Sequence, residues 1–243
     1  MIADGWLGAQ LGGDAFRVEW PGAAASGACI DALREHAERH RRALYFAKVA
    51  TTDVEAVRTL SAEGFYVVDV NVVMSRPLGI ATVAGHESVI VRVQQPDDRD
   101  GVLEIAGSAF RYTRFHLDPL IPTAVAHALK RSWIESYVRG VRGDRLFVAL
   151  DRDQRPAGFL AALVSSEDAT ATAVIDLIGI RADRQRSGVG TALVATFFEH
   201  YRDRVARYLV GTQAANVPSL AFYQRLGFVV TRTTFVLHKH TRP

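Results

Sequence analysis

Cysteine is almost absent from this sequence of 243 residues, and long apolar runs are missing altogether. Because Cys29 is the only cysteine, an intrachain disulfide and a cysteine-based zinc cluster are both excluded. No stretch approaches the roughly 18 apolar residues that a membrane-spanning helix needs. The first residues include acids and no long apolar core, so we expect no secretory signal. These absences predict a protein of the reducing cytoplasm that makes no membrane contact.

A strong excess of one charge is also lacking. The chain has 29 Lys and Arg against 26 Asp and Glu, which gives a formal net charge of +3. This mild positive balance favours small anionic ligands and is far below that of a nucleic-acid-binding surface, so no nucleic-acid partner is expected. Hydrophobic residues make up 49% of the chain, a composition typical of a globular protein with one large or two small domains.

Apolar periodicity after residue 87 predicts alternating strands and helices. The predicted elements are, in order, a strand at 88–93, helices at 97–110 and 124–139, strands at 145–150, 158–164 and 172–180, a helix at 189–201, a strand at 208–212, a helix at 218–226 and a strand at 228–238. The stretch 76–86 contains two Gly and one Pro and is interpreted as a linker. We therefore predict an N-terminal domain at 1–80 and a second domain at 87–243.

The two predicted domains share an internal repeat. Residues 48–76 align with residues 211–239, and Gly227 follows Gly64 by 163 residues (227 minus 64). Both segments contain a strand, a helix, a Gly-Phe pair and a long final strand. The N-terminal segment therefore indicates a degenerate copy of the C-terminal one.

A glycine-containing turn separates the strand at 172–180 from the helix at 189–201, and it runs from Gln185 to Gly190. At the start of a helix, unpaired backbone N–H groups point toward one site, and the positive end of the helix dipole lies there as well. A phosphate is therefore the expected ligand of this turn. Gly188 and Gly190 lack a Cβ that would obstruct the phosphate. Alternatively, the turn only connects a strand to a helix.

This turn and a second motif, Asn216 followed by Tyr223 and Gly227-Phe228, together resemble the GNAT superfamily of acetyl-CoA-dependent N-acetyltransferases. The resemblance covers residues 88–243. It implies an α/β fold of layered helices and strands, with a mixed central sheet splayed between its fourth and fifth strands. Acetyl-CoA is the implied cosubstrate and enters at the splay, no metal is implied, and the N-terminal half is a degenerate half-GNAT domain.

The resemblance also implies roles for individual residues. Backbone N–H groups of the turn hold the pyrophosphate, and the pantetheine arm extends the sheet along the end of the strand at 172–180. The expected acetyl-CoA-binding residues are Leu177, Ile178, Gly179, Ile180, Gln185, Arg186, Ser187, Gly188, Val189, Gly190, Thr191 and Asn216. Tyr223 is the implied proton donor to the leaving sulfur, or alternatively a core tyrosine. Asn216 contacts the cofactor, caps the following helix, or does both.

Asp176 is the best candidate for the general base, because many relatives place a carboxylate four residues before the position of Ile180. The alternative is an ordinary strand acid that pairs with an arginine. Asn71 shares a strand face with Asp69, so this face either reaches the acceptor or faces solvent. His238 and His240 are interpreted as residues of the tail.

The degenerate N-terminal half and the segment 108–119 resemble the dTDP-fucosamine acetyltransferase group, which acetylates an amine on a nucleotide-linked deoxy-amino sugar. Arg114 and His116 are the expected acceptor-binding residues, or belong to a surface loop. Acetylation of another small amine or of a protein N-terminus, and a non-catalytic acetyl-CoA-binding module, are the competing hypotheses. A homodimer through the edge of the final strand is compatible with the pattern.

Overall fold

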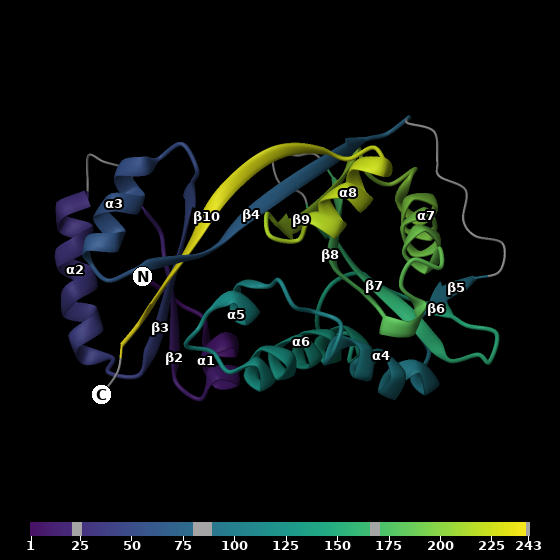
Figure 1. Ribbon diagram of the computed structural model, residues 1–243, viewed down its shortest axis with the longest axis horizontal. Helices are drawn as coiled ribbons and strands as arrows, with labels where there is room; N and C mark the ends of the chain where they lie inside the picture. The colour runs from purple at the N-terminus through teal and green to yellow at the C-terminus, as the bar shows by residue number, and fades with distance from the viewer. Residues whose placement is uncertain (21–25, 80–88, 166–170, 242–243) are drawn as a thin grey trace.

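The computed structural model describes residues 1–20, 26–79, 89–165 and 171–241, and its strands form one 10-stranded sheet flanked by helices (Figure 1). The N-terminal half contains β1 (Ile2–Ala3), α1 (Gly5–Leu11), β2 (Asp14–Val18), α2 (Ser26–Arg39), β3 (Ala43–Ala50), α3 (Val54–Ala62) and β4 (Tyr66–Pro77). The C-terminal half contains β5 (Ile90–Val93), η2 (Pro96–Asp98), α4 (Arg99–Ala106), α5 (Arg114–Leu117), α6 (Thr123–Val138), β6 (Arg145–Leu150), β7 (Pro156–Ser165), β8 (Thr172–Ile180), η4 (Ala182–Arg184), α7 (Val189–Tyr201), β9 (Arg207–Gln213), α8 (Val217–Arg225) and β10 (Val229–His240).

The predicted α/β order of the C-terminal half is confirmed, and β6, β8 and α7 have the predicted bounds. The short helix α5 lies in a segment for which the sequence predicts a loop. The predicted linker begins too early, because β4 continues through Pro77 and Arg76 is buried at 2% exposure. The boundaries at 80 and 87 lie outside the described residues, so the division into two domains stays a prediction.

Alternating side chains of the strands build two hydrophobic layers, one on each face of the sheet. In β6, Phe147 and Ala149 pack with α7, whereas Leu146 and Val148 pack with α4 and α6. In β3, Tyr45 and its alternate neighbours pack with α2 and α3, whereas the other face packs with α1, α5 and α6. Because α6 contributes to the cores of both halves, the two halves share one helical layer (Figure 1).

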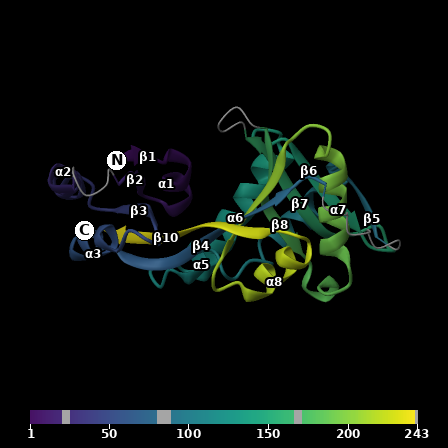
Figure 2. The same cartoon turned by 90° about the horizontal axis from the view of Figure 1, so that it is seen from above.

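The two halves also exchange their long strands. The sheet order is β1-β2-β3-β10-β4-β9-β8-β7-β6-β5, so β4 lies beside β9 and β10 lies beside β3. At the centre, Asn71 pairs with Thr234, which is also its partner in the 163-residue repeat (234 minus 71). Asn71 faces Gln213 on β9, and Thr234 faces Ala50 on β3. The repeated segments are therefore related by a local two-fold arrangement, and β4 and β10 bridge the halves in both views (Figure 2).

This topology limits the edge at which the predicted homodimer could form. The final strand β10 pairs with β4 along most of its length but with β3 only from Thr234 to His240, so residues 229–232 have no β3 partner. A homodimer through this edge stays a prediction. Among the described helices, none combines the length and the apolar character that crossing a bilayer requires.

Candidate active site

The sheet opens between β8 and β9, as the resemblance implies. The two strands pair in parallel only from Thr172 to Ile175 of β8. Beyond Ile175, the remaining residues of β8 have no partner on that side. A cleft of about 1450 Å³ begins there and continues to the turn before α7 and to the face of β4 that carries Asn71.

Most of the predicted acetyl-CoA residues line this cleft. Those that line it are Leu177, Ile178, Gly179, Ile180, Gln185, Arg186, Gly188, Gly190, Thr191 and Asn216. The side chain of Val189 is buried in the core, and the hydroxyl of Ser187 donates to the Arg184 carbonyl at 2.6 Å. Neither residue lines the cleft, so a role of their backbone N–H groups in binding stays a prediction.

The turn before α7 has the backbone geometry of an anion-binding loop. Gly188 has φ +85° and caps the N-terminus of α7, and Arg186 adopts φ +60° although it is not a glycine. A left-handed backbone conformation is uncommon among non-glycine residues. Where it does occur, it is often at a ligand-binding or active site. In the part of the chain that the structure describes, the exposed Arg186 side chain lines the cleft and makes no ion pair, so it is free to meet a phosphate.

Two residues of the second motif, Asn216 and Tyr223, also line the cleft. Tyr223 of α8 is 3% exposed and lines the cleft, and its hydroxyl has no hydrogen-bond partner among the described residues. Burial raises the pKa of Tyr223, so its phenol keeps its proton at neutral pH. Asn216 caps α8 by accepting from the Ser219 N–H at 3.4 Å, which confirms its capping role and leaves its amide N–H groups for the cleft.

Asp176 lies on a β-bulge at the point where the sheet opens. Ala161 and Ala162 of β7 pair with Leu177 and Ile175, so Asp176 is the extra residue. Its Oδ2 accepts three hydrogen bonds. The donors and distances are Trp133 Nε1 at 2.9 Å, Tyr137 Oη at 2.6 Å and Arg142 Nε at 3.1 Å. The arginine pairing expected as the alternative is present, and the same carboxylate lines the cleft.

The cleft is strongly cationic. The basic side chains that line it are Lys48, Arg111, Lys130, Arg184, Arg186, Arg207, Arg225 and Arg232. Among the described residues, Asp176 is the one acidic side chain that lines it. Such a field favours an anionic ligand and disfavours a polycation.

Two predicted acceptor residues, Arg114 and His116, do not line the cleft. The Arg114 guanidinium stacks on Phe46 at 4.1 Å and Phe115 at 4.5 Å, and it donates to His238 Nε2 at 3.3 Å. His116 contacts Thr113 and His127 instead. Of the three predicted acceptor residues, only Asn71 lines the cleft, and its amide donates to the Thr212 carbonyl at 3.2 Å.

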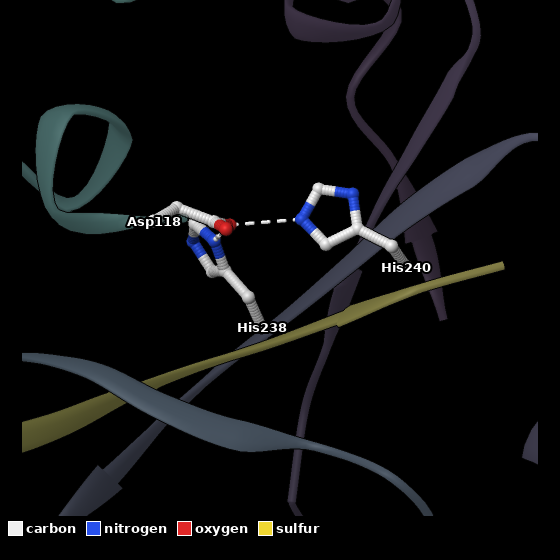
Figure 3. A group of neighbouring side chains, drawn as sticks. All are labelled: Asp118, His238 and His240. Atoms are coloured by element: carbon white, nitrogen blue, oxygen red, sulfur yellow. Dashed lines mark hydrogen bonds and ion pairs between the residues drawn. The ribbon is translucent and has the colours of Figure 1, made fainter. Parts of the chain in front are cut away.

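Asp118, His238 and His240 form a compact cluster beneath α5, with potential ligand atoms within 4.8 Å of one another (Figure 3). Asp118 Oδ2 contacts His238 Nδ1 at 2.6 Å and His240 Nε2 at 2.8 Å. Because Arg114 can only donate to His238 Nε2, the His238 proton lies on Nδ1 and is donated to Asp118. These contacts form a hydrogen-bonded network that joins the end of α5 to β10.

This cluster corrects the interpretation of the histidines as tail residues, because His238 is completely buried. Asp69 likewise does not face solvent: it is 7% exposed, and burial raises its pKa to about 6. Sequence reasoning also missed Lys130, which is 6% exposed in the apolar face of α6. Its spacing from Ala126 and Ile134, four residues on either side, was an available signal of burial.

Comparison with known proteins agrees with this geometry. Residues 111–228 match the model of the Acetyltransferase (GNAT) family. The spore coat polysaccharide biosynthesis protein SpsD of Bacillus subtilis (strain 168) is 21% identical over 145 residues, which are 59% of this chain and 48% of that protein. The chain therefore spans about half the length of this curated relative.

Two solved structures share the fold. A GCN5-related N-acetyltransferase from Sphaerobacter thermophilus has a TM-score of 0.60 at 17% identity, over 88% of this chain and 66% of that chain. A tandem GNAT protein from the clavulanic acid biosynthesis pathway has a TM-score of 0.63 at 15% identity, over 94% and 76% of the two chains. The arrangement of two related halves is therefore found in a known structure.

Proposed function

The chain contains a GNAT acetyltransferase domain, and we propose that it moves an acetyl group from acetyl-CoA to the primary amine of a nucleotide-linked deoxy-amino sugar. The observation that carries this proposal is the cleft at the splay of β8 and β9. It joins the turn before α7, Asp176 and Tyr223 in one continuous space.

Acetyl-CoA binding follows from the open edge of β8 and the turn. The backbone N–H groups of the turn hold the pyrophosphate, with Arg186 as an additional cation. The pantetheine arm takes the place of a strand beside Ile178 to Ile180, where β8 has no partner on its β9 side. This binding brings the thioester to the region of Leu177 and Ile178, beside the β-bulge.

The reaction is a direct attack in a ternary complex. The neutral acceptor nitrogen forms a bond with the acetyl carbonyl carbon, and the carbon–sulfur bond breaks as the tetrahedral intermediate collapses. The proton lost from the nitrogen passes through water to Asp176, and the Tyr223 phenol protonates the CoA thiolate. Trp133, Tyr137 and Arg142 hold the carboxylate in one orientation through its Oδ2 atom.

The charge of the cleft supports an anionic acceptor. Besides Arg186, which is assigned to the pyrophosphate, seven basic side chains and Asp176 belong to the described lining, so the cleft would repel a polyamine and attract a sugar linked to phosphates. The similarity to a polysaccharide biosynthesis protein points in the same direction.

A thiol-release assay tests the proposal. Purified protein and acetyl-CoA are mixed with dTDP- and UDP-linked amino sugars, with spermidine, and with a peptide that has a free N-terminus. We expect free CoA with an amino-sugar nucleotide and only background with the other amines. If CoA is released with the peptide or with spermidine but not with the amino-sugar nucleotides, the acceptor is of another class than the one proposed. If no amine gives CoA release, a non-catalytic acetyl-CoA-binding module is favoured.

A further inference from the structure

A buried lysine that lines the cleft has no hydrogen-bond or ion-pair partner among the described residues. Lys130 of α6 is 6% exposed and lines the cleft near Asp176. Its ammonium lies 4.7 Å from the ring of Trp133, 5.7 Å from Phe110 and 5.8 Å from Phe115. Among the described residues it makes no hydrogen bond or ion pair. An ammonium in such a site is costly unless a ligand compensates it.

The groups around Lys130 compensate its charge only in part. Its ammonium faces three aromatic rings, and Asp176 attracts it, but the Oδ2 of that carboxylate already accepts from Trp133, Tyr137 and Arg142. Arg114 and Arg142 add positive potential from α5 and from the segment after α6. Three ammonium N–H donors therefore remain for a group that enters the cleft.

We propose that Lys130 binds a phosphate carried by the acceptor sugar and thereby makes the enzyme prefer phosphorylated amino sugars to free ones. The aromatic rings give this subsite an apolar wall on which the face of a sugar ring can pack. Because Lys130 and Asp176 line the same cleft and interact electrostatically, the proposal assigns to Lys130 the phosphate attached directly to the sugar. The inference deepens the proposed function and depends on it for the identity of the acceptor.

Calorimetry on the CoA-saturated protein tests the subsite, with D-glucosamine 1-phosphate and D-glucosamine as probes. We expect the wild type to bind the phosphate about 10- to 100-fold more tightly than the free sugar, the range of a charge-assisted hydrogen bond. Lys130→Met keeps a long apolar stem and should abolish this difference, while Lys130→Arg should retain most of it. The affinity for CoA should stay the same in all three proteins.

Two results would overturn the inference. One is equal affinity of the wild type for both probes. The other is an equal loss of affinity for both probes in Lys130→Met, which would mean that Lys130 only shapes the cleft. Protection of Lys130 against acetic anhydride by glucose 1-phosphate, which carries the phosphate but no amine that would consume the reagent, tests the same contact in the wild type alone, so a misfolded variant does not decide the matter.

Transfer assays separate this inference from the proposed function. If Lys130-dependent phosphate binding is present and no sugar amine is acetylated, the anion subsite holds and the proposed function fails. If free and phosphorylated amino sugars are acetylated equally by the wild type and by Lys130→Met, the proposed function holds and the subsite is wrong.

Discussion

Tyr223 is one of the few polar groups in the cleft whose environment fixes its protonation. Its raised pKa keeps the phenol protonated, as a donor to the leaving thiolate must be. Tyr223→Phe should therefore lower kcat about 100-fold, within the usual range for general acid catalysis. Thiol release measures kcat, and calorimetry should show an affinity for CoA within about two-fold of the wild type. Unchanged turnover would remove Tyr223 from the mechanism.

Gly188 allows a second experiment on a single residue, because Gly64 is a matched control. Both glycines have strongly positive φ, +85° and +84°, but only Gly188 lines the cleft. Replacement by Ala should cost about 1–2 kcal/mol of stability at either position. Gly188→Ala should also weaken CoA binding at least tenfold, because it alters the anion-binding turn, while Gly64→Ala should not. Equal CoA affinity of the two variants, measured by calorimetry, would contradict the assignment of the turn.

The protonation of Lys130 should make the affinity for a phosphorylated acceptor depend on pH. Burial lowers the pKa of Lys130 to about 8, and the charged groups that face it are Asp176 of β8, Arg114 of α5 and Arg142. The ammonium carries its charge below this pH and loses it above, so KM for glucosamine 1-phosphate should rise between pH 7 and pH 9. Lys130→Arg stays charged and should lack this rise. A parallel rise in both proteins would assign the effect to another group.

Among single residues, the sequence predicted those site residues that belong to a local motif. The turn, Asn216 and Tyr223 each belong to a contiguous pattern, and the structure brings them to one cleft. The partners of Asp176 come from α6 and from Arg142, between 34 and 43 residues away, and no local pattern encodes such a contact. Arg114 was expected in the cleft because its loop is basic, whereas two aromatic rings and His238 hold it elsewhere.

At the scale of elements, the repeat was visible and the exchange of strands was not. The strand, helix and Gly-Phe pair recur because each segment forms the same local unit, in which Asp53 and Asn216 cap equivalent helices. Which strand pairs with which is decided by long-range register. Both β4 and β10 are long enough to reach a strand of the other half, and nothing in their apolar pattern distinguishes the two partners.

The Asp118 network links α5 to β10, and it should make the protein sensitive to acid. The pKa of His238 is lowered to about 4, chiefly by burial, while that of Asp118 lies well below its usual range. Between pH 6.5 and 4, His238 is protonated in the unfolded chain but stays neutral in the folded protein. The free energy of unfolding therefore falls as the pH falls. From pH 7 to pH 5 this loss should reach about 2 kcal/mol.

His238→Asn tests this linkage, because its amide can still donate to Asp118 and does not titrate. Urea unfolding at pH 7 and pH 5 should show a smaller loss of stability in the variant than in the wild type. His116, whose pKa is also lowered to about 4, titrates in both proteins and cancels in the comparison. Equal losses would mean that His238 does not govern the acid sensitivity.

At the scale of the whole molecule, the two halves depend on each other because their strands form one sheet. β4 lies between β9 and β10, and β10 lies between β3 and β4. Trp6 of α1 also packs edge-on against Trp133 at 5.4 Å, and Trp133 donates to Asp176. The N-terminal half therefore supports the cleft although most of the cleft lining belongs to the other half.

A fragment experiment follows from this interdependence. Residues 87–243 alone would leave β9 without β4 and would leave β10 without both β3 and β4, which exposes three strand edges, so we expect this fragment to aggregate. Expressed together with residues 1–80, it should form a complex that binds CoA with the affinity of the intact chain, because the strand pairs need no covalent link. Size-exclusion chromatography and calorimetry on the co-purified fragments measure both. If residues 87–243 are monomeric and bind CoA normally on their own, the N-terminal half is dispensable, and the exchanged strands do not stabilise the cleft.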